Sequence, residues 1–134
     1  MSEWWAAALA GLLYYVLGAA WFTPLFGQAW DRSIGHDRTR TAGRFPISYY
    51  VLPLAGSLVT AAVIAWLQSA VSVDGAGAGA GTLVGAGVGL AIAAASLTNA
   101  LTPHTPHPYA FAAITGGYHL VGCTIAGLTV GLIG

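Results

Sequence analysis

The sequence predicts an all-α integral membrane protein with four transmembrane helices, packed as a tight, glycine-rich bundle in a single membrane domain over residues 1–134. Hydrophobic residues make up 57% of the chain, charged residues only 6%, and 19 residues are glycine. The mean hydropathy is +0.74. Because an average soluble domain carries roughly 25% charged residues, this chain lacks the polar surface that a soluble fold requires.

Four apolar runs divide the chain, and no Asp, Glu, Lys or Arg falls inside any of them. We expect helices over residues 4–22, 47–70, 81–101 and 109–133. At about 1.5 Å per residue, helices of about 20 residues span a hydrocarbon core of about 30 Å. Each run therefore predicts one membrane crossing.

Proline and glycine mark the segments between these runs. Thr23-Pro24 predicts the end of the first helix, because proline disfavours the helical conformation in the residue before it. The connector over 23–46 has room for a short interfacial helix around 28–33. The glycine-rich string over 71–80 predicts a flexible turn, and three prolines in 103–108 exclude a regular helix there.

The positions of the arginines predict the orientation of the chain in the membrane. All four arginines lie in the 23–46 connector, and the chain has no lysine. The positive-inside rule therefore places that connector in the cytoplasm and both termini outside, in the inner (plasma) membrane of a cell, with the lipid bilayer as the first partner. Four arginines balanced by four acids exclude a nucleic-acid partner, which needs a broad basic face.

The fourth run resolves into a bulky face and a small face. Large residues recur at intervals of three and four and predict a lipid-facing stripe: Ile114, Tyr118, Val121, Ile125, Leu128 and Leu132. The opposite face holds Gly116, His119, Cys123, Ala126 and Val130. His119 is therefore expected to point inward, about 15 Å into the membrane.

The third run carries small residues at intervals of four, namely Gly81, Gly85, Gly89 and Ala93. This small-x-x-x-small pattern lets membrane helices approach closely. The same stripe continues into Ser96 and Asn99, so the last turn of that helix is polar on the packed face.

His119 has two interpretations. An ionisable ring inside a membrane helix indicates a proton or ligand site, because both ring nitrogens need partners where no water is available. Alternatively, His119 hydrogen-bonds a neighbour and joins two helices; Tyr14 or Tyr15 in the first run and Ser57 or Thr60 in the second lie at similar depth. The sequence leaves both open.

A second candidate site lies at the cytoplasmic mouth of the bundle. Trp21, Tyr49, Ser96 and Asn99 stand at the inner ends of three helices, with the 103–108 loop over them. Asn99 is costly in lipid, so it is expected to face a partner or water.

Metal, cofactor and enzyme interpretations find little support. His104 and His107, with His36 from the other cytoplasmic connector, would be the metal ligands, but zinc and copper sites need three or four ligands and a second shell. The chain contains no paired carboxylates, no nucleophile beside a base and no phosphate loop. We therefore expect no enzyme activity, no cofactor and no bound metal.

The chain resembles a bacterial family of small four-helix membrane proteins, domain of unknown function 1761, nearly end to end. The resemblance is carried by Gly18-Ala19-Ala20-Trp21-Phe22-Thr23-Pro24 with Phe26-Gly27 and Trp30, by Leu97-Thr98-Asn99, and by Gly117-Tyr118-His119-Leu120-Val121. It implies the four-helix topology and marks these positions, and it implies no activity.

The sequence thus supports two functions. The first is proton or small-solute transport, or a channel-like role, through a polar site formed by His119 with Tyr14 or Tyr15 and reached past Asn99 and Trp21. The second is an accessory or scaffold subunit of a larger membrane complex, with His119 joining helices. Four glycine-rich spans enclose little volume alone, so we expect a homo-oligomer or a membrane partner.

Overall fold

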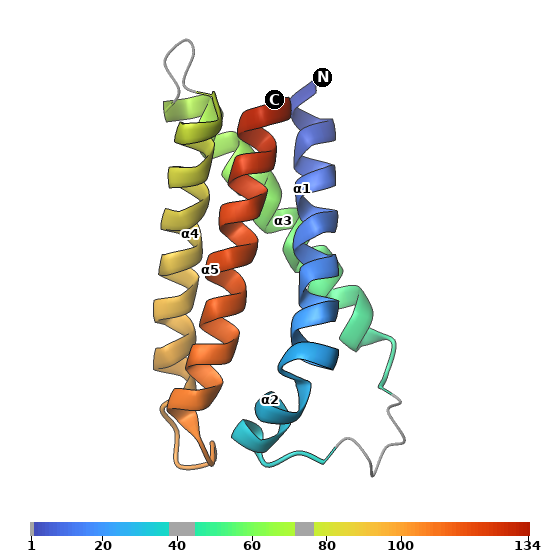
Figure 1. Ribbon diagram of the computed structural model, residues 1–134, viewed down its shortest axis with the longest axis vertical. Coiled ribbons are helices and arrows are strands. Elements are labelled where there is room, and N and C mark those ends of the chain that lie inside the picture. The colour runs from blue at the N-terminus through green and yellow to red at the C-terminus, as the bar shows by residue number, and fades with distance from the viewer. Residues whose placement is uncertain (1, 38–44, 72–76) are drawn as a thin grey trace.

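A computed structural model describes residues 2–37, 45–71 and 77–134 of the protein (Figure 1). All secondary-structure elements among the described residues are helices, and four of them are long and apolar enough to cross a membrane. These are α1 (Ser2–Ala20), continued by the π-helix η1 (Trp21–Leu25), and α3 (Ser48–Val71), α4 (Gly77–Ala100) and α5 (Pro108–Ile133). A short helix, α2 (Gly27–Ile34), lies between η1 and α3. The predicted all-helical fold with four helices of membrane-spanning length and apolarity is confirmed.

α5 is the central helix of the bundle. In Figure 1, α4 lies along one side of α5 and α1 along the other, while α3 crosses behind them. The two termini lie at one end of the molecule, and α2 lies at the opposite end against α5. We refer to these as the termini end and the α2 end.

The first helix does not stop at Thr23-Pro24, as the sequence predicted. The chain instead widens into η1, which contains Pro24, and the Phe26 amide donates to the Trp21 carbonyl across five residues at 2.8 Å. Proline lacks an amide hydrogen and its ring crowds the carbonyl four residues earlier in an α-helix. A π-turn accommodates the proline without breaking the helical path.

The short helix expected around 28–33 is present as α2. It ends at Gly35, whose φ of 70° is the left-handed conformation typical of a glycine after a helix C-terminus. Asp31 and Ser33 are buried on its inner side, and the Ser33 carbonyl accepts from the His107 amide at 3.1 Å. The bond ties α2 to the loop before α5. Residues 38–44, which include three of the four arginines, lie outside the described residues.

α4 begins at Gly77, four residues before the start expected from sequence. The predicted turn over 71–80 is therefore wrong for 77–80, and residues 72–76 lie outside the described part of the chain. Lipid offers the backbone no hydrogen bonds, so a glycine-rich segment gains from helix formation there. The first turn also contacts α5: a Cβ added at Gly131 would lie 2.6 Å from the Gly77 carbonyl oxygen.

α4 and α5 touch through their backbones at successive levels. A Cβ added at Gly85 would overlap the Cys123 carbonyl oxygen, and one at Gly89 would lie 2.7 Å from the carbonyl oxygen of His119. Larger side chains at these positions would force the two helices apart. Close contact of this kind provides van der Waals attraction, which holds membrane helices together where the surrounding lipid is equally apolar.

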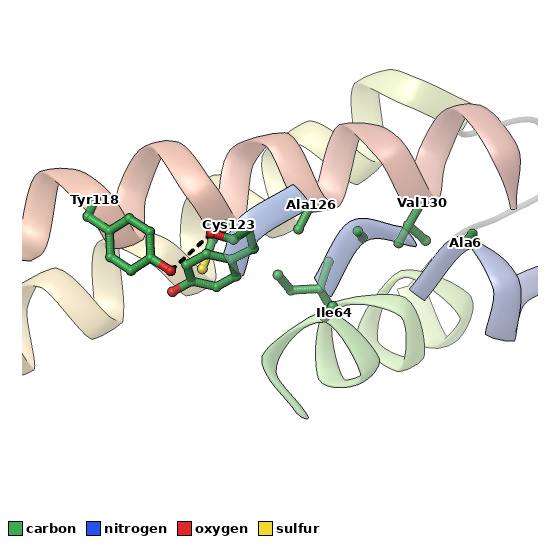
Figure 2. Packing of buried hydrophobic residues seen from close by; sticks show 9 residues of the cluster. Ala6, Ile64, Tyr118, Cys123, Ala126 and Val130 are labelled. Atoms are coloured by element: carbon green, nitrogen blue, oxygen red, sulfur yellow. Dashed lines mark hydrogen bonds between the residues drawn. The ribbon is translucent and has the colours of Figure 1, made fainter. Parts of the chain in front are cut away.

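The main core lies between α1, α3 and α5. Its aliphatic part contains Ala6 and Ala10 of α1, Ile64 of α3, and Ala126 and Val130 of α5, each at most 4% exposed (Figure 2). Tyr14, Tyr118 and Cys123 continue the same cluster toward the α2 end. Small residues dominate this core, so the helices approach closely.

One lipid-facing assignment on α5 is wrong. Tyr118 is only 7% exposed, whereas Val121, Leu128 and Leu132 of the same predicted stripe are exposed. The periodicity assumed one buried face, but α5 is covered by α4 on one side and by α1 on the other. The buried arc is therefore wide enough to include Tyr118, which is turned about 100° from His119 around the helix.

Candidate functional site

Tyr14 and His119 form a hydrogen-bonded pair in the middle of the bundle. The Tyr14 hydroxyl is hydrogen-bonded to His119 Nδ1. The rings meet edge to face, with centroids 5.9 Å apart and an interplanar angle of 86°. Tyr14 is 2% exposed and His119 is half-buried. His119 lies near the middle of the 26-residue α5, so the pair stands near the centre of the membrane span.

Two tyrosines and two glycines interlock α1 with α5 around this pair. A Cβ added at Gly122 would lie 2.6 Å from the Tyr14 ring, and one added at Gly18 would lie 2.8 Å from the Tyr118 hydroxyl. Each helix thus carries a Tyr-x-x-x-Gly segment whose glycine receives the tyrosine of the other helix. Since residues four apart share one helix face, this exchange fixes how α1 and α5 face each other.

Tyr118 holds the backbone of α1 next to the pair. Its hydroxyl donates to the Tyr14 carbonyl oxygen at 3.1 Å, and its ring packs on those of Tyr14 and His119 at centroid distances of 5.0 and 4.9 Å. Tyr118 therefore positions the ring that binds His119.

The Tyr14 side chain belongs to the same core cluster as the fully buried Cys123. A tyrosine hydroxyl donates one hydrogen bond and accepts others. When the neutral His119 ring carries its hydrogen on Nε2, the Tyr14 hydroxyl donates to Nδ1. When Nδ1 carries a hydrogen, it donates to the Tyr14 hydroxyl oxygen instead. The pair can hold His119 in both protonation states.

The other ring nitrogen of His119, Nε2, receives no hydrogen bond from the part of the chain that the structure describes. It is also not among the polar atoms that are sealed from the surface without a partner, unlike Nε2 of His36. The Nε2 edge of the ring is therefore not sealed from the surface. This edge is available to a ligand, a water molecule or a lipid-phase neighbour.

The other residues proposed around His119 do not join the pair. Tyr15 and Thr60 are half-buried, and neither hydrogen-bonds His119 in the described chain. Trp21 is half-buried at the α2 end, where its Nε1 donates to the Ile114 carbonyl oxygen at 2.9 Å and its ring packs on Phe26. Of the two tyrosines left open by the sequence, the structure selects Tyr14.

The predicted cytoplasmic mouth is not assembled among the described residues. Asn99 is exposed on α4, and Tyr49 is 60% exposed on α3. The Ser96 hydroxyl donates to the Ile92 carbonyl of its own helix at 2.9 Å. Trp21 packs instead against α5, which separates it from α4.

The three histidines weighed as metal ligands are not gathered into a site. Over residues 2–37, 45–71 and 77–134, no group of three or more His, Cys, Asp or Glu side chains is placed to hold a metal ion. His104 and His107 are exposed in the loop before α5, and His36 packs on the Phe45 ring with centroids 6.2 Å apart.

Sequence reasoning missed two contributors to the site. Tyr118 was assigned to the lipid face, although the repetition of Tyr-x-x-x-Gly at 14–18 and 118–122 was a signal of a matched helix pair. The second is Trp30 of α2, whose Nε1 donates to Thr115 Oγ1 at 3.3 Å. Thr115 lies one turn before His119 on α5, and no sequence pattern indicated that α2 would reach it.

Comparison with known proteins gives one match. A family model described as protein of unknown function (DUF1761) matches residues 5–131, nearly the whole chain. No curated protein and no solved structure matches the chain. The resemblance drawn from the short sequence segments is confirmed, and the match assigns no chemistry to the Tyr14–His119 pair.

Proposed function

Because the chain belongs to this family of proteins of unknown function, we propose its role from the site: a non-enzymatic membrane protein that passes protons, or a small neutral or weakly basic solute, through the Tyr14–His119 pair. The observation that carries the proposal is the hydrogen bond between the Tyr14 hydroxyl and His119 Nδ1 inside an apolar bundle. Histidine is the side chain whose unperturbed charge change falls nearest neutral pH.

The chemistry of the pair supports proton handling. In the tautomer in which Nδ1–H donates to the Tyr14 hydroxyl oxygen, Nε2 carries the free lone pair of the neutral ring and can take up a proton, after which both ring nitrogens bear hydrogen. The bundle therefore needs no rearrangement of its helices to accommodate either form of the ring. Ionisable residues inside membrane helices are by default associated with substrate or proton pathways.

The topology proposed with this role places both termini outside the cell and the α2 end in the cytoplasm, in the inner (plasma) membrane. It is supported by the four arginines in the 23–46 connector. We also propose that the close glycine-mediated contact of α4 with α5 persists in the membrane.

Reconstitution tests the function. Proteoliposomes that contain the wild-type protein, a pH-sensitive dye and an imposed potential are expected to acidify, and His119→Ala is expected to reduce the proton flux to that of empty vesicles. Tyr15→Phe is the matched control, since Tyr15 follows Tyr14 but lies outside the pair. If His119→Ala and wild type move protons and every tested solute equally, the proposal is wrong.

A second candidate, an accessory or scaffold subunit, is favoured by the unpartnered apolar faces of α3 and α4. Leu52, Trp66, Leu83 and Leu90 on these helices are 62–75% exposed. In this role the Tyr14–His119 bond joins two helices and moves nothing. It requires a partner protein that co-purifies in fixed proportion, and a closed homo-oligomer with a hydrated cavity would exclude it.

A further inference from the structure

The two directions along α5 from His119 differ in how tightly they are closed. Toward the termini end, Ala126 and Val130 pack with Ala6, Ala10 and Ile64, and none of these side chains is more than 4% exposed (Figure 2). Small, interdigitated side chains of this kind leave no space for a solute. The bundle is sealed on that side of the pair.

Toward the α2 end, α5 is much less covered. Between residues 108 and 117, Gly116 is the only buried residue of the helix, and all of these residues are described. Thr115 and Ala112, one and two turns from His119, are half-buried on the same side of the helix. Covering side chains at this end come largely from the half-buried aromatic residues of η1 and α2, among them Trp21, Phe22 and Trp30.

Thr115 is a polar group suited to receive a solute next to His119. Its Oγ1 accepts from Trp30 Nε1 at 3.3 Å. The hydroxyl hydrogen of Thr115 therefore remains able to donate. Residues four apart on a helix have their Cβ atoms about 6 Å apart. We therefore expect a water molecule or a similarly small hydrogen-bonding solute to bridge that hydroxyl and the Nε2 edge of His119.

We infer that, in this conformation of the bundle, His119 is reached by water and small polar solutes from the α2 end alone, past Trp30 and Thr115, and is closed toward the termini end, so that passage to the other face requires a second conformation. This inference rests on the proposed function of the Tyr14–His119 pair as a polar station. It adds a direction of access and makes Thr115 a second polar group of the same path.

Cysteine accessibility tests the inference in a Cys123→Ser background, in intact cells and in inverted vesicles, with a membrane-impermeant thiol reagent. Gln28→Cys on α2 and Gly134→Cys at the C-terminus are both exposed and mark the two faces of the membrane. Thr115→Cys is expected to react only from the face that labels Gln28→Cys.

Thr129→Cys is the matched control, because it makes the same substitution on the same helix at a position only 9% exposed toward the termini end. It is expected to react from neither face. Leu128→Cys, 38% exposed on the lipid side, should also stay unlabelled, which separates exposure to water from exposure to lipid. Gel filtration of each variant verifies folding before labelling.

Labelling of Thr115→Cys from the termini face, or from neither face, would overturn the inference, as would labelling of Thr129→Cys. The readout does not depend on transport. If Thr115→Cys is labelled as expected but His119→Ala leaves the proton flux unchanged, the access path stands and the proposed transport function is refuted. The reverse result, loss of flux with an unreactive Thr115→Cys, would refute the path alone.

Discussion

The Tyr14 hydroxyl and the His119 ring meet inside an apolar bundle, where their hydrogen bond joins α1 to α5. Hydrogen bonds between membrane helices contribute about 0.6 kcal/mol on average and up to about 1.7 kcal/mol. The interlock of Gly18 and Gly122 with the two tyrosines holds the hydroxyl at the ring. The bond therefore serves both to stabilise the α1–α5 contact and to orient the ring, and the two contributions are separable by mutation.

A double-mutant cycle measures the stabilising part. Tyr14→Phe, His119→Ala and the double variant are expected to give a coupling energy of about 0.6–1.7 kcal/mol in reversible unfolding by detergent titration, because each single change removes the same bond. Tyr15→Phe combined with His119→Ala should show no coupling. Equal coupling for both tyrosines would contradict the pairing seen in the structure.

At the level of helices, the contact between α4 and α5 depends on residues without side chains. A Cβ on Gly85 would overlap the carbonyl oxygen of Cys123, and this oxygen belongs to a helical backbone that cannot rotate away. On the same helix, Gly87 has no heavy atom within 4 Å of an added Cβ. Gly85 therefore packs tightly against α5, whereas Gly87, two residues later, has open space around it.

Gly85→Ala is expected to destabilise the protein by about 1–3 kcal/mol, the usual range for overpacking a close contact. Gly87→Ala, its control, should be neutral or stabilising by up to about 1 kcal/mol, since alanine favours helix over glycine. The free energies of unfolding of both variants, measured in the same detergent titration, test this difference. A Gly85→Ala variant as stable as Gly87→Ala would show that the helices are not in backbone contact.

Over the whole molecule, the four spans cover one another unevenly. In the most apolar 18-residue stretch of each helix, only 17% of the residues of α4 and 22% of the residues of α3 are buried within the chain. Apolar side chains can face lipid, so these faces do not require a protein partner. They do leave room for one, and self-association adds packing that a chain with so many small residues lacks by itself.

Self-association predicts a protein mass in detergent that is a multiple of the 13.6 kDa chain. Light scattering with detergent correction measures that mass, and Leu83→Ala and Leu90→Ala, both on the exposed face of α4, should lower it if α4 forms the contact. Val59→Ala on exposed α3 is the matched control. A monodisperse single chain without any co-purifying protein would refute self-association.

Much of the fold follows from the sequence, because lipid allows few alternatives. Each apolar run becomes one helix whose ends lie within about four residues of the predicted ones, which is the usual scatter of such boundaries. The most instructive departures are at Pro24, which lies inside η1, and at Gly77, where α4 begins. Proline and glycine break helices in water, but in lipid the backbone has no other hydrogen-bond donors or acceptors.

The site was less predictable. The depth of a residue in the membrane follows from its position along the helix. The sequence therefore predicts that His119, Tyr14 and Tyr15 lie at similar depth. Which neighbouring helix a side chain contacts depends on how its own helix is rotated about its axis, and Tyr14 and Tyr15 differ by about 100° around α1. The choice between them, and the buried position of Tyr118, required knowledge of which helices flank α5.

The sequence by itself determined the membrane class, the four spans and the placement of a histidine near the membrane centre, since these depend on local hydrophobicity and on the length of each run. The tertiary structure alone decided that α5 is central, that Tyr14 binds His119, and that Trp30 of α2 reaches Thr115 one turn before His119. Those outcomes depend on which helix faces make contact, and the shapes of glycine and tyrosine on two distant segments set that contact jointly.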